Sequence, residues 1–237
     1  MIVSLLAVAG AFVLPSAHRP RPPARCRTPV AAADVTDRPD PAILVSARPL
    51  SEQQFAFSAI STGVAAGASV ATALLAHVDA FTDKAPVLLP LPLGLAFFVA
   101  GISHFTLKDL FVRITPPRGT WGFWAAPAPG AELLGLSYEE YHVYWTGVAE
   151  VIGGGALALA ALGVVPIPQQ APAALCGLLT AAVTPANIFQ FTHDRPLRPE
   201  IPIDIPYPSG HAARGVIQMV LIAVWWGLAT LPSPPAA

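Results

Sequence analysis

The sequence predicts an all-α membrane protein: a four-helix transmembrane bundle with one extra N-terminal transmembrane helix. Composition is the first observation behind this class. Hydrophobic residues make up 54% of the 237 residues and charged residues only 11%, whereas soluble domains carry about 25% charged residues. The second observation is a series of five apolar stretches, each of about 20 residues, the length that a helix needs to cross a bilayer. A formal net charge of −1 gives no indication of nucleic-acid binding.

Residues 1–33 are expected to be a targeting presequence and to take no part in the fold. Residues 2–14 are apolar but too short to span easily, and residues 9–11 form a small-x-small cleavage signal before Phe12. Residues 18–27 contain four arginines, three prolines and no acidic side chain. This order resembles the two-part presequences of algae with secondary plastids, which implies a plastid membrane. An ordinary signal peptide with a basic linker is the alternative.

The rest of the chain is expected to divide into four parts. Residues 34–53 form a polar linker, and residues 54–86 hold the extra N-terminal helix and a loop. Residues 87–231 form the four-helix membrane domain, and residues 232–237 a tail. The extra helix, expected at residues 55–78, is rich in Ala, Gly, Ser and Thr, small residues that let helices pack closely in a membrane.

The second and third spans are expected at residues 87–105 and 143–165, with a long polar loop at residues 106–135 between them. Trp121 and Trp124 in this loop are expected at the level of the lipid headgroups, where tryptophan is enriched.

Ser137 and Glu140 precede the third span with the spacing of a capping box, in which each side chain binds the backbone amide of the other residue. We therefore interpret Glu139 and Glu140 as residues that start a helix rather than as catalytic carboxylates.

The last two spans are expected at residues 171–189 and 211–231. Pro185 lies inside the fourth span and should kink it, because proline removes a helical hydrogen bond. Trp225 and Trp226 are expected to anchor the fifth span near a membrane interface.

Basic residues predict how the helices are oriented. If the linker, the long loop and the loop after the fourth span share one face, the other face holds only Lys84. Basic residues favour the side that is not translocated, which in a plastid is the stromal side. The basic residues of the first face are Arg38, Arg48, Lys108, Arg113, Arg118, Arg195 and Arg198.

Glu150 lies in the middle of the third span. An ionisable group at membrane depth costs about 3 kcal/mol and usually faces the bundle interior or a water-filled cavity. On the fifth span, His211, Arg214 and Gln218 are spaced i, i+3 and i+7 and therefore share one face. Arg214 is the only arginine within a span, so the sequence predicts a Glu150–Arg214 pair or a shared hydrogen-bond network. The structural alternative is that such a pair only fixes helix register.

Further residues are expected to join this network. Asn187 and Gln218 would be its neutral members, and Gly153 and Gly154 should let another helix approach, such as the one that carries Arg214. His104 is expected to face the same cavity, with a histidine solvated by headgroups as the alternative. No catalytic residue is assigned, and no metal site is predicted, because the sequence lacks paired ligands of the His-x-x-x-His type. The candidate buried polar cluster is His104, Glu150, Asn187, His211, Arg214 and Gln218.

With these residues in view, the chain from residue 93 to residue 231 resembles the DoxX-like family of small four-helix membrane proteins. Four segments carry the resemblance, in this order: Val-Ala-Gly-Ile-Ser-His-Phe at 99–105, Thr-Gly-Val-Ala-Glu-Val-Ile-Gly-Gly-Gly at 146–155, Val-Thr-Pro-Ala-Asn-Ile at 183–188 and Arg-Gly-Val-Ile-Gln at 214–218. The resemblance implies a link to quinones or redox stress. The chain departs from the family by its extra helix, its long loop, its presequence and the lack of a cysteine at a matched site.

Two hypotheses of function follow. In the first, the protein binds a quinone between its helices, and His104 or Glu150 relays protons. No flavin, haem or iron–sulfur motif is evident in the sequence, so electrons would come from a redox partner subunit. In the second, the protein is a non-enzymatic scaffold or assembly factor, or a small-solute carrier, and the polar cluster holds the bundle together or lines a path. The sequence leaves the choice between enzyme and non-enzyme open.

Overall fold

The computed structural model describes residues 39–195 and 206–232. The expected presequence, Arg38 and Arg198 lie outside these residues. Over the described ranges the chain is helical and contains no strand. Its α-helices are α2 (Leu50–Leu75), α3 (Asp79–Leu88), α4 (Pro90–Thr106), α5 (Lys108–Ile114), α6 (Tyr138–Ala161), α7 (Gln170–Ala182), α8 (Thr184–Thr192) and α9 (Ser209–Thr230), joined by the short 3₁₀ helices η1 (Pro41–Ile43), η2 (Val45–Ala47) and η3 (Thr120–Gly122).

The predicted class, all-α with a set of membrane spans, is confirmed. Among the described residues, four helical segments are long and apolar enough to cross a bilayer, namely α2, α6, α7 with α8, and α9. A fifth span is added if α3 and α4, which meet at an angle of 57°, are counted together. The first span starts at Leu50, inside the segment expected as a linker, because residues 50–53 continue the helix. The chain is thus an integral membrane protein built of helices.

Proline residues set two of the breaks in these spans. Pro90 starts α4 in its first turn, directly after the bend that follows α3. Pro185 lies in the first turn of α8, and Val183 separates α8 from α7, so the predicted kink in the fourth span is confirmed. Proline is tolerated at a first helical turn because the amide it lacks would have no helical partner there.

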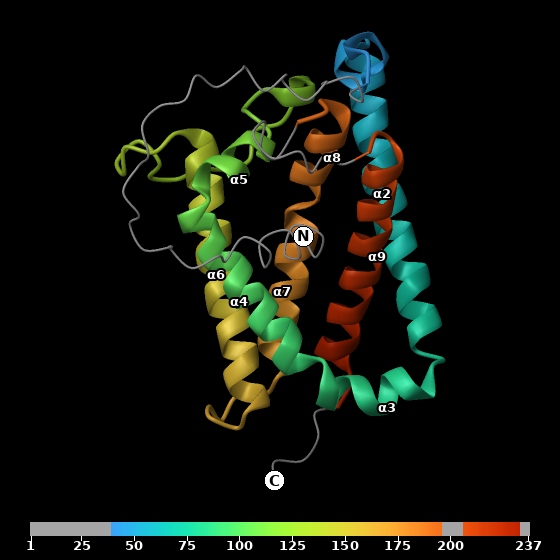
Figure 1. Cartoon of the computed structure of the whole chain (residues 1–237), viewed down its shortest axis with the longest axis vertical. Helices are drawn as coiled ribbons and strands as arrows, with labels where there is room; N and C mark the ends of the chain where they lie inside the picture. The colour runs from blue at the N-terminus through green and yellow to red at the C-terminus, as the bar shows by residue number, and fades with distance from the viewer. Residues whose placement is uncertain (1–38, 196–205, 233–237) are drawn as a thin grey trace, which may run out of the picture.

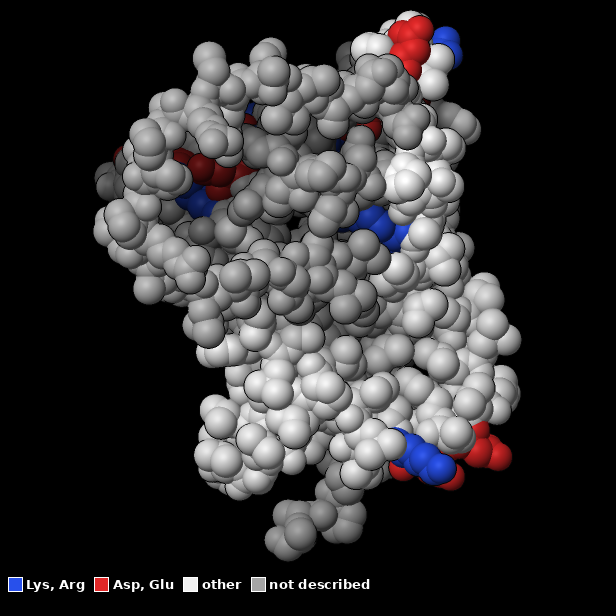
Figure 2. Space-filling model, in the orientation of Figure 1, with Lys and Arg blue, Asp and Glu red and all other residues white. Residues whose placement is uncertain are grey.

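The two ends of the bundle differ in their elements. In Figure 1, α3 and the turn at residues 162–169 lie at the lower end, while η1, η2, α5 and η3 lie at the upper end. Figure 2 shows charged side chains at the lower end and an uncharged surface directly above it. Among the described basic residues, Lys108 and Arg113 belong to α5, Arg48 directly follows η2, and Lys84 belongs to α3. Charge is therefore distributed along the bundle as the sequence predicts.

Helices α4 and α6 pack through glycines. A Cβ atom placed on Gly154 would lie 2.5 Å from the Phe98 backbone nitrogen and 2.6 Å from the Gly94 carbonyl oxygen. One on Gly101 would lie 2.7 Å from the Gly147 carbonyl oxygen. Such close backbone contact requires glycine at these positions, because a side chain there would collide with the facing helix. The helix that approaches Gly154 is therefore α4, and the expectation that this helix carries Arg214 is wrong.

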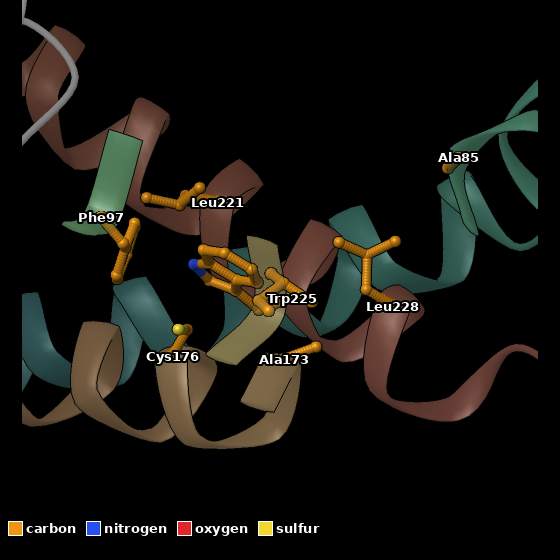
Figure 3. Close-up of a cluster of buried hydrophobic side chains, with 8 residues drawn as sticks. Ala85, Phe97, Ala173, Cys176, Leu221, Trp225 and Leu228 are labelled. Atoms are coloured by element: carbon orange, nitrogen blue, oxygen red, sulfur yellow. The ribbon is translucent and has the colours of Figure 1, made fainter. Parts of the chain in front are cut away.

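The apolar core lies between α4, α6, α7 and α9, and Trp225 is at its centre (Figure 3). Trp225 is 0% exposed and packs edge-on against Phe97, with ring centroids 4.7 Å apart. Cys176 of α7 lies in the same cluster. Trp226 is 60% exposed, so only one of the two adjacent tryptophans can reach a membrane interface. The expectation that Trp225 is an interfacial anchor is wrong, because successive residues of a helix point about 100° apart.

The loop at residues 106–135 is more ordered than its composition indicates. It contains α5 and η3, and Trp121 packs against Ile188 and Phe189 of α8. Trp121 is 2% exposed and therefore buried within the protein. The prediction that it lies among the lipid headgroups is wrong. This contact with α8 and the tilted packing of Phe57 on Trp121, with ring centroids 4.6 Å apart, fix the loop over the ends of α2 and α8.

Candidate functional site

A cavity of about 130 Å³ opens between the helices at the end of the bundle where α5 lies. Residues from α4, α5, α6, the α7–α8 junction and α9 line it. Most of the lining is apolar. The polar lining residues are Ser103, His104, Thr115, His142, Thr146, Glu150, Asn187 and Arg214.

His104 of α4 and Glu150 of α6 lie together on one wall of the cavity. The His104 Nε2 atom is 3.4 Å from Glu150 Oε2, and the two side chains are 9% and 1% exposed. The close glycine contacts between α4 and α6 bring the two side chains together. Glu150 Oε2 has no hydrogen-bond partner in the described part of the chain, which leaves a buried carboxyl oxygen at the edge of the cavity.

The contacts of Nδ1, the second ring nitrogen of His104, indicate which of the two nitrogens carries a proton. Nδ1 lies 2.9 Å from the Val143 carbonyl oxygen, which can only accept a hydrogen bond, and 3.1 Å from the Thr146 hydroxyl, which donates to the His142 carbonyl oxygen. A proton on Nδ1 is the assignment that satisfies these contacts. In a neutral ring Nε2 is then an acceptor and faces Glu150 Oε2. A proton between these two atoms, on either one, turns two facing acceptors into a hydrogen-bonded pair.

Helix α5 covers the His104 ring. Phe111 stacks on His104 with ring centroids 3.9 Å apart. Lys108, at the start of α5, donates to Glu140 Oε1 of α6 at 2.6 Å. The capping box predicted for Ser137 and Glu140 is confirmed, with the Glu140 amide 3.1 Å from Ser137 Oγ. Glu140 thus both starts α6 and holds α5 over the cavity, and hydrogen bonding to it raises the pKa of Lys108.

Arg214 of α9 lines another wall of the cavity and is 9% exposed. Its guanidinium donates to Gln190 Oε1 and, at 2.8 Å, to Asn187 Oδ1. Asn187 in turn donates to Gln218 Oε1 at 2.7 Å. Gln218 donates to the Thr180 carbonyl oxygen at 3.1 Å, one turn before the break between α7 and α8. This chain of amides connects α7, α8 and α9.

Glu150 and Arg214 line the same cavity but form no ion pair. The described ion pairs are His104–Glu150 and Lys108–Glu140, and neither includes Arg214. The structure places Asn187, Arg214 and Gln218 in one hydrogen-bond network, whereas Glu150 lies beside His104. The prediction of a direct Glu150–Arg214 pair is therefore wrong, because α4 and not α9 packs directly against the Glu150 region of α6.

His211 does not line the cavity, unlike the other ionisable members of the predicted cluster. It lies in the first turn of α9, with its ring centroid 5.5 Å from that of Phe191 and 5.9 Å from that of Tyr207. Gln218 also stays outside the lining and supports Asn187 from behind.

Sequence reasoning missed two residues of the site. Gln190 is 1% exposed and binds Arg214, although it directly follows the fourth span expected at residues 171–189. Its position three residues after Asn187 is the signal that places both side chains on one helix face. The role of Phe111 could not be predicted, because α5 has only 7 residues and lies within a polar segment.

Comparison with known proteins gives no match to this chain, whether with protein-family models, with curated proteins or with solved structures.

Proposed function

We propose that this integral membrane protein binds a quinone in the cavity between α4, α5, α6, α8 and α9 and serves a redox process there. The observation that carries the proposal is the arrangement of polar groups within an apolar chamber. His104 and Glu150 lie on the wall formed by α4 and α6, and Asn187 and Arg214 on the wall formed by α8 and α9.

The size of the cavity suits a single six-membered ring. An apolar protein cavity of about 150 Å³ holds benzene, and this one measures about 130 Å³. Two of its lining side chains, Val99 and Trp145, are 41% and 39% exposed on the outer surface. An isoprenoid tail attached to the ring can therefore extend past them into the lipid.

The two polar walls offer hydrogen bonds to both carbonyl oxygens of a quinone. Arg214 has five N–H donors, and the hydrogen bonds to Gln190 and Asn187 leave others for a ligand. On the other wall, the proton between His104 and Glu150 is within the site and can be donated to the second oxygen. General acid groups placed in this way favour reduction of a quinone, since each reduction takes up protons.

The resemblance to DoxX-like proteins in residues 93–231 supports this assignment, because that family is tied to quinones. We place the functional unit in residues 87–231, with the helix at residues 54–86 as an addition, and a redox partner subunit as the electron source. The presequence that the sequence predicts at residues 1–33 supports a plastid membrane as the location.

The test is a titration of the purified mature protein in nanodiscs with a short-chain plastoquinone analogue. Wild type is compared with Glu150→Gln and with Glu52→Gln, a matched change at an exposed glutamate of α2. In Glu150→Gln the amide donates to His104 Nε2 and turns its carbonyl oxygen toward the ligand. We expect saturable binding in wild type and Glu52→Gln, and at least about tenfold weaker binding in Glu150→Gln, which is about 1.4 kcal/mol.

Absence of saturable binding to the folded wild type contradicts the proposal. The non-enzymatic hypothesis, a scaffold, assembly factor or solute carrier, then takes its place. In that case the amide network around Arg214 serves to join α7, α8 and α9, and the next measurement identifies what co-purifies with the protein.

A further inference from the structure

We propose that the same cavity binds organic anions, and that each anion enters together with one proton. The anionic group binds at Arg214, and the proton occupies the space between His104 Nε2 and Glu150 Oε2. This inference goes beyond the proposed quinone and does not depend on it, since it follows from the charges that line the cavity.

Arg214 brings a buried positive charge to the cavity. This guanidinium is 9% exposed, and its hydrogen bonds go to the neutral amides of Asn187 and Gln190. Within residues 39–195 and 206–232 it has no ion-pair partner. A buried cation costs several kcal/mol unless a counter-charge compensates it. The site therefore attracts an anion.

The His104–Glu150 pair can hold one proton between its two side chains. Because Nδ1 is protonated toward the Val143 carbonyl oxygen, the pair has one exchangeable position, between two atoms 3.4 Å apart. With a proton there, the pair is neutral overall. Without it, the pair carries a charge of −1, which offsets the charge of Arg214 across the cavity. Glu150 Oε2 is buried and has no hydrogen-bond partner in the described residues. A proton between the two side chains gives this oxygen a hydrogen bond to His104 Nε2.

The charges of Arg214 and Glu150 couple binding of the anion to uptake of the proton. An empty cavity is neutral when the pair has lost its proton, because Glu150 then balances Arg214. A cavity holding an anion is neutral only when the pair has regained it. The anion therefore competes with the Glu150 carboxylate for Arg214, and a solvent proton removes the competitor. No bond of the ligand forms or breaks.

Other ionisable groups near the pair do not supply this balance. Among the described residues, Glu150 is the only carboxylate in the cavity lining, and His142 is the other ionisable side chain besides His104 and Arg214. His142 accepts a hydrogen bond from Trp145 Nε1 at 2.8 Å. Helix α5 presents Phe111 and Ile114 to the cavity, the α7–α8 side presents Asn187 but no ionisable group, and Lys108 and Glu140 pair with each other. Cys176 of α7 lies in the apolar core.

The probe for this inference is benzoate, with benzamide as its neutral counterpart. Calorimetric titration of the full protein in nanodiscs, in buffers of different ionisation enthalpy, gives the number of protons taken up per benzoate. We expect a value near one, and benzoate affinity that rises up to about tenfold for each unit by which pH falls. Benzamide, if it binds, should take up no proton.

Variants separate the two charges. Glu150→Gln removes the competing carboxylate, so it should bind benzoate more tightly than wild type at high pH and without proton uptake. This sign is opposite to the weaker quinone binding expected for the same variant. Arg214→Gln should abolish benzoate binding. Because that variant can fail to fold, Arg214→Lys is the companion, and it should retain proton-coupled binding. Glu52→Gln is the control and should match wild type.

Three results would overturn the inference: no benzoate binding by the folded wild type, binding without proton uptake, or unchanged proton uptake in Glu150→Gln. Quinone binding without benzoate binding refutes this inference alone. Benzoate binding without quinone binding refutes the proposed function alone.

Discussion

At the scale of single residues, burial of the Glu150 carboxyl group depends on the neighbouring His104. The carboxyl group is 1% exposed and the His104 imidazole is its neighbour at 3.4 Å. Phe111 stacks on the face of the imidazole ring, and Nδ1 is hydrogen-bonded to the Val143 carbonyl oxygen. The ring is therefore held on its face and at both nitrogens, which is the arrangement expected of a group that must present one nitrogen to a partner.

Replacing His104 by alanine should destabilise the protein by about 3 kcal/mol, because it leaves a buried carboxyl group without its partner. For a chain of this size that loss lowers the melting temperature by about 6 °C or more. Thermal unfolding in nanodiscs measures the shift. The double variant His104→Ala with Glu150→Leu should recover part of it, and His77→Ala, at an exposed residue, should have little effect. Equal losses in the single and double variants would refute the dependence.

The predicted cluster includes four of the polar residues that line the cavity, namely His104, Glu150, Asn187 and Arg214, but the sequence did not reveal their partners. Glu150 and Arg214 are conspicuous because charged groups are rare in spans, and the i, i+3 and i+7 spacing places Arg214 and Gln218 on one helix face. Spacing along one helix does not reveal which helix packs against it. The partner of Glu150 depends on the backbone contact at Gly154, and this contact has no signal in the spacing of polar residues.

At the scale of elements, the contact between α4 and α6 positions the site. The Cβ atom that Gly154 lacks would meet backbone atoms of α4, which cannot move aside as a flexible side chain would. The same two helices hold His104 and Glu150, so their separation determines the distance between the two side chains.

Gly154→Ala should therefore cost about 1–3 kcal/mol through overpacking and should also weaken ligand binding. Gly63→Ala is the matched control, because a Cβ atom there meets nothing within 4 Å and alanine favours a helix by up to about 1 kcal/mol. Unfolding in nanodiscs and the quinone titration measure both effects. A Gly154→Ala protein as stable as wild type would show that the helices do not need this contact.

The attachment of α5 should depend on pH through Lys108. Hydrogen bonding to Glu140 raises the pKa of Lys108 above its usual 10.5. A raised pKa means that the folded state holds the proton more tightly, so the contribution to stability is fully present below pH 10.5 and is lost as pH rises through the raised value. Lys108→Gln should thus be less stable than wild type at neutral pH, and the difference in melting temperature should shrink above that pH. A difference independent of pH would exclude the charge as its source.

Hydrophobic length predicts the spans well and short helices poorly. The stretches expected at residues 171–189 and 211–231 correspond to α7 with α8 and to α9, because burial in lipid requires a continuous apolar helix. The bend before α4 and the short α5 depend on tertiary contacts, such as Phe111 against His104, that no local pattern encodes.

At the scale of the whole molecule, the helices form a bundle with distinct ends. The end with α5, η1 and η3 holds most described basic residues, and the end with α3 holds Lys84 (Figure 1). Large apolar side chains such as Phe55, Leu74 and Leu178 are 75%, 65% and 71% exposed. In a bilayer these side chains contact lipid, which explains why α2 remains stable although it buries little of its surface in the protein.

If α3 and α4 together cross the bilayer as the fifth span, the start of α3 and α5 lie on opposite sides of the membrane. In a background without Cys26 and Cys176, Asp83→Cys and Arg113→Cys introduce single cysteines at exposed positions of the two helices. A thiol reagent that cannot cross membranes should label one of them in sealed vesicles and the other only after permeabilisation. Labelling of both from the same side would contradict the five-span arrangement.

The most direct measurement of the central claim is photo-crosslinking with an azido-quinone, followed by mass spectrometry of the labelled peptides. The cavity predicts labels at its lining, in the segments around His104, Thr146 and Asn187, and competition by excess unlabelled quinone. Labels confined to the lipid-facing surface of α2, or labels that excess quinone does not reduce, would contradict the claim that this cavity is a quinone site.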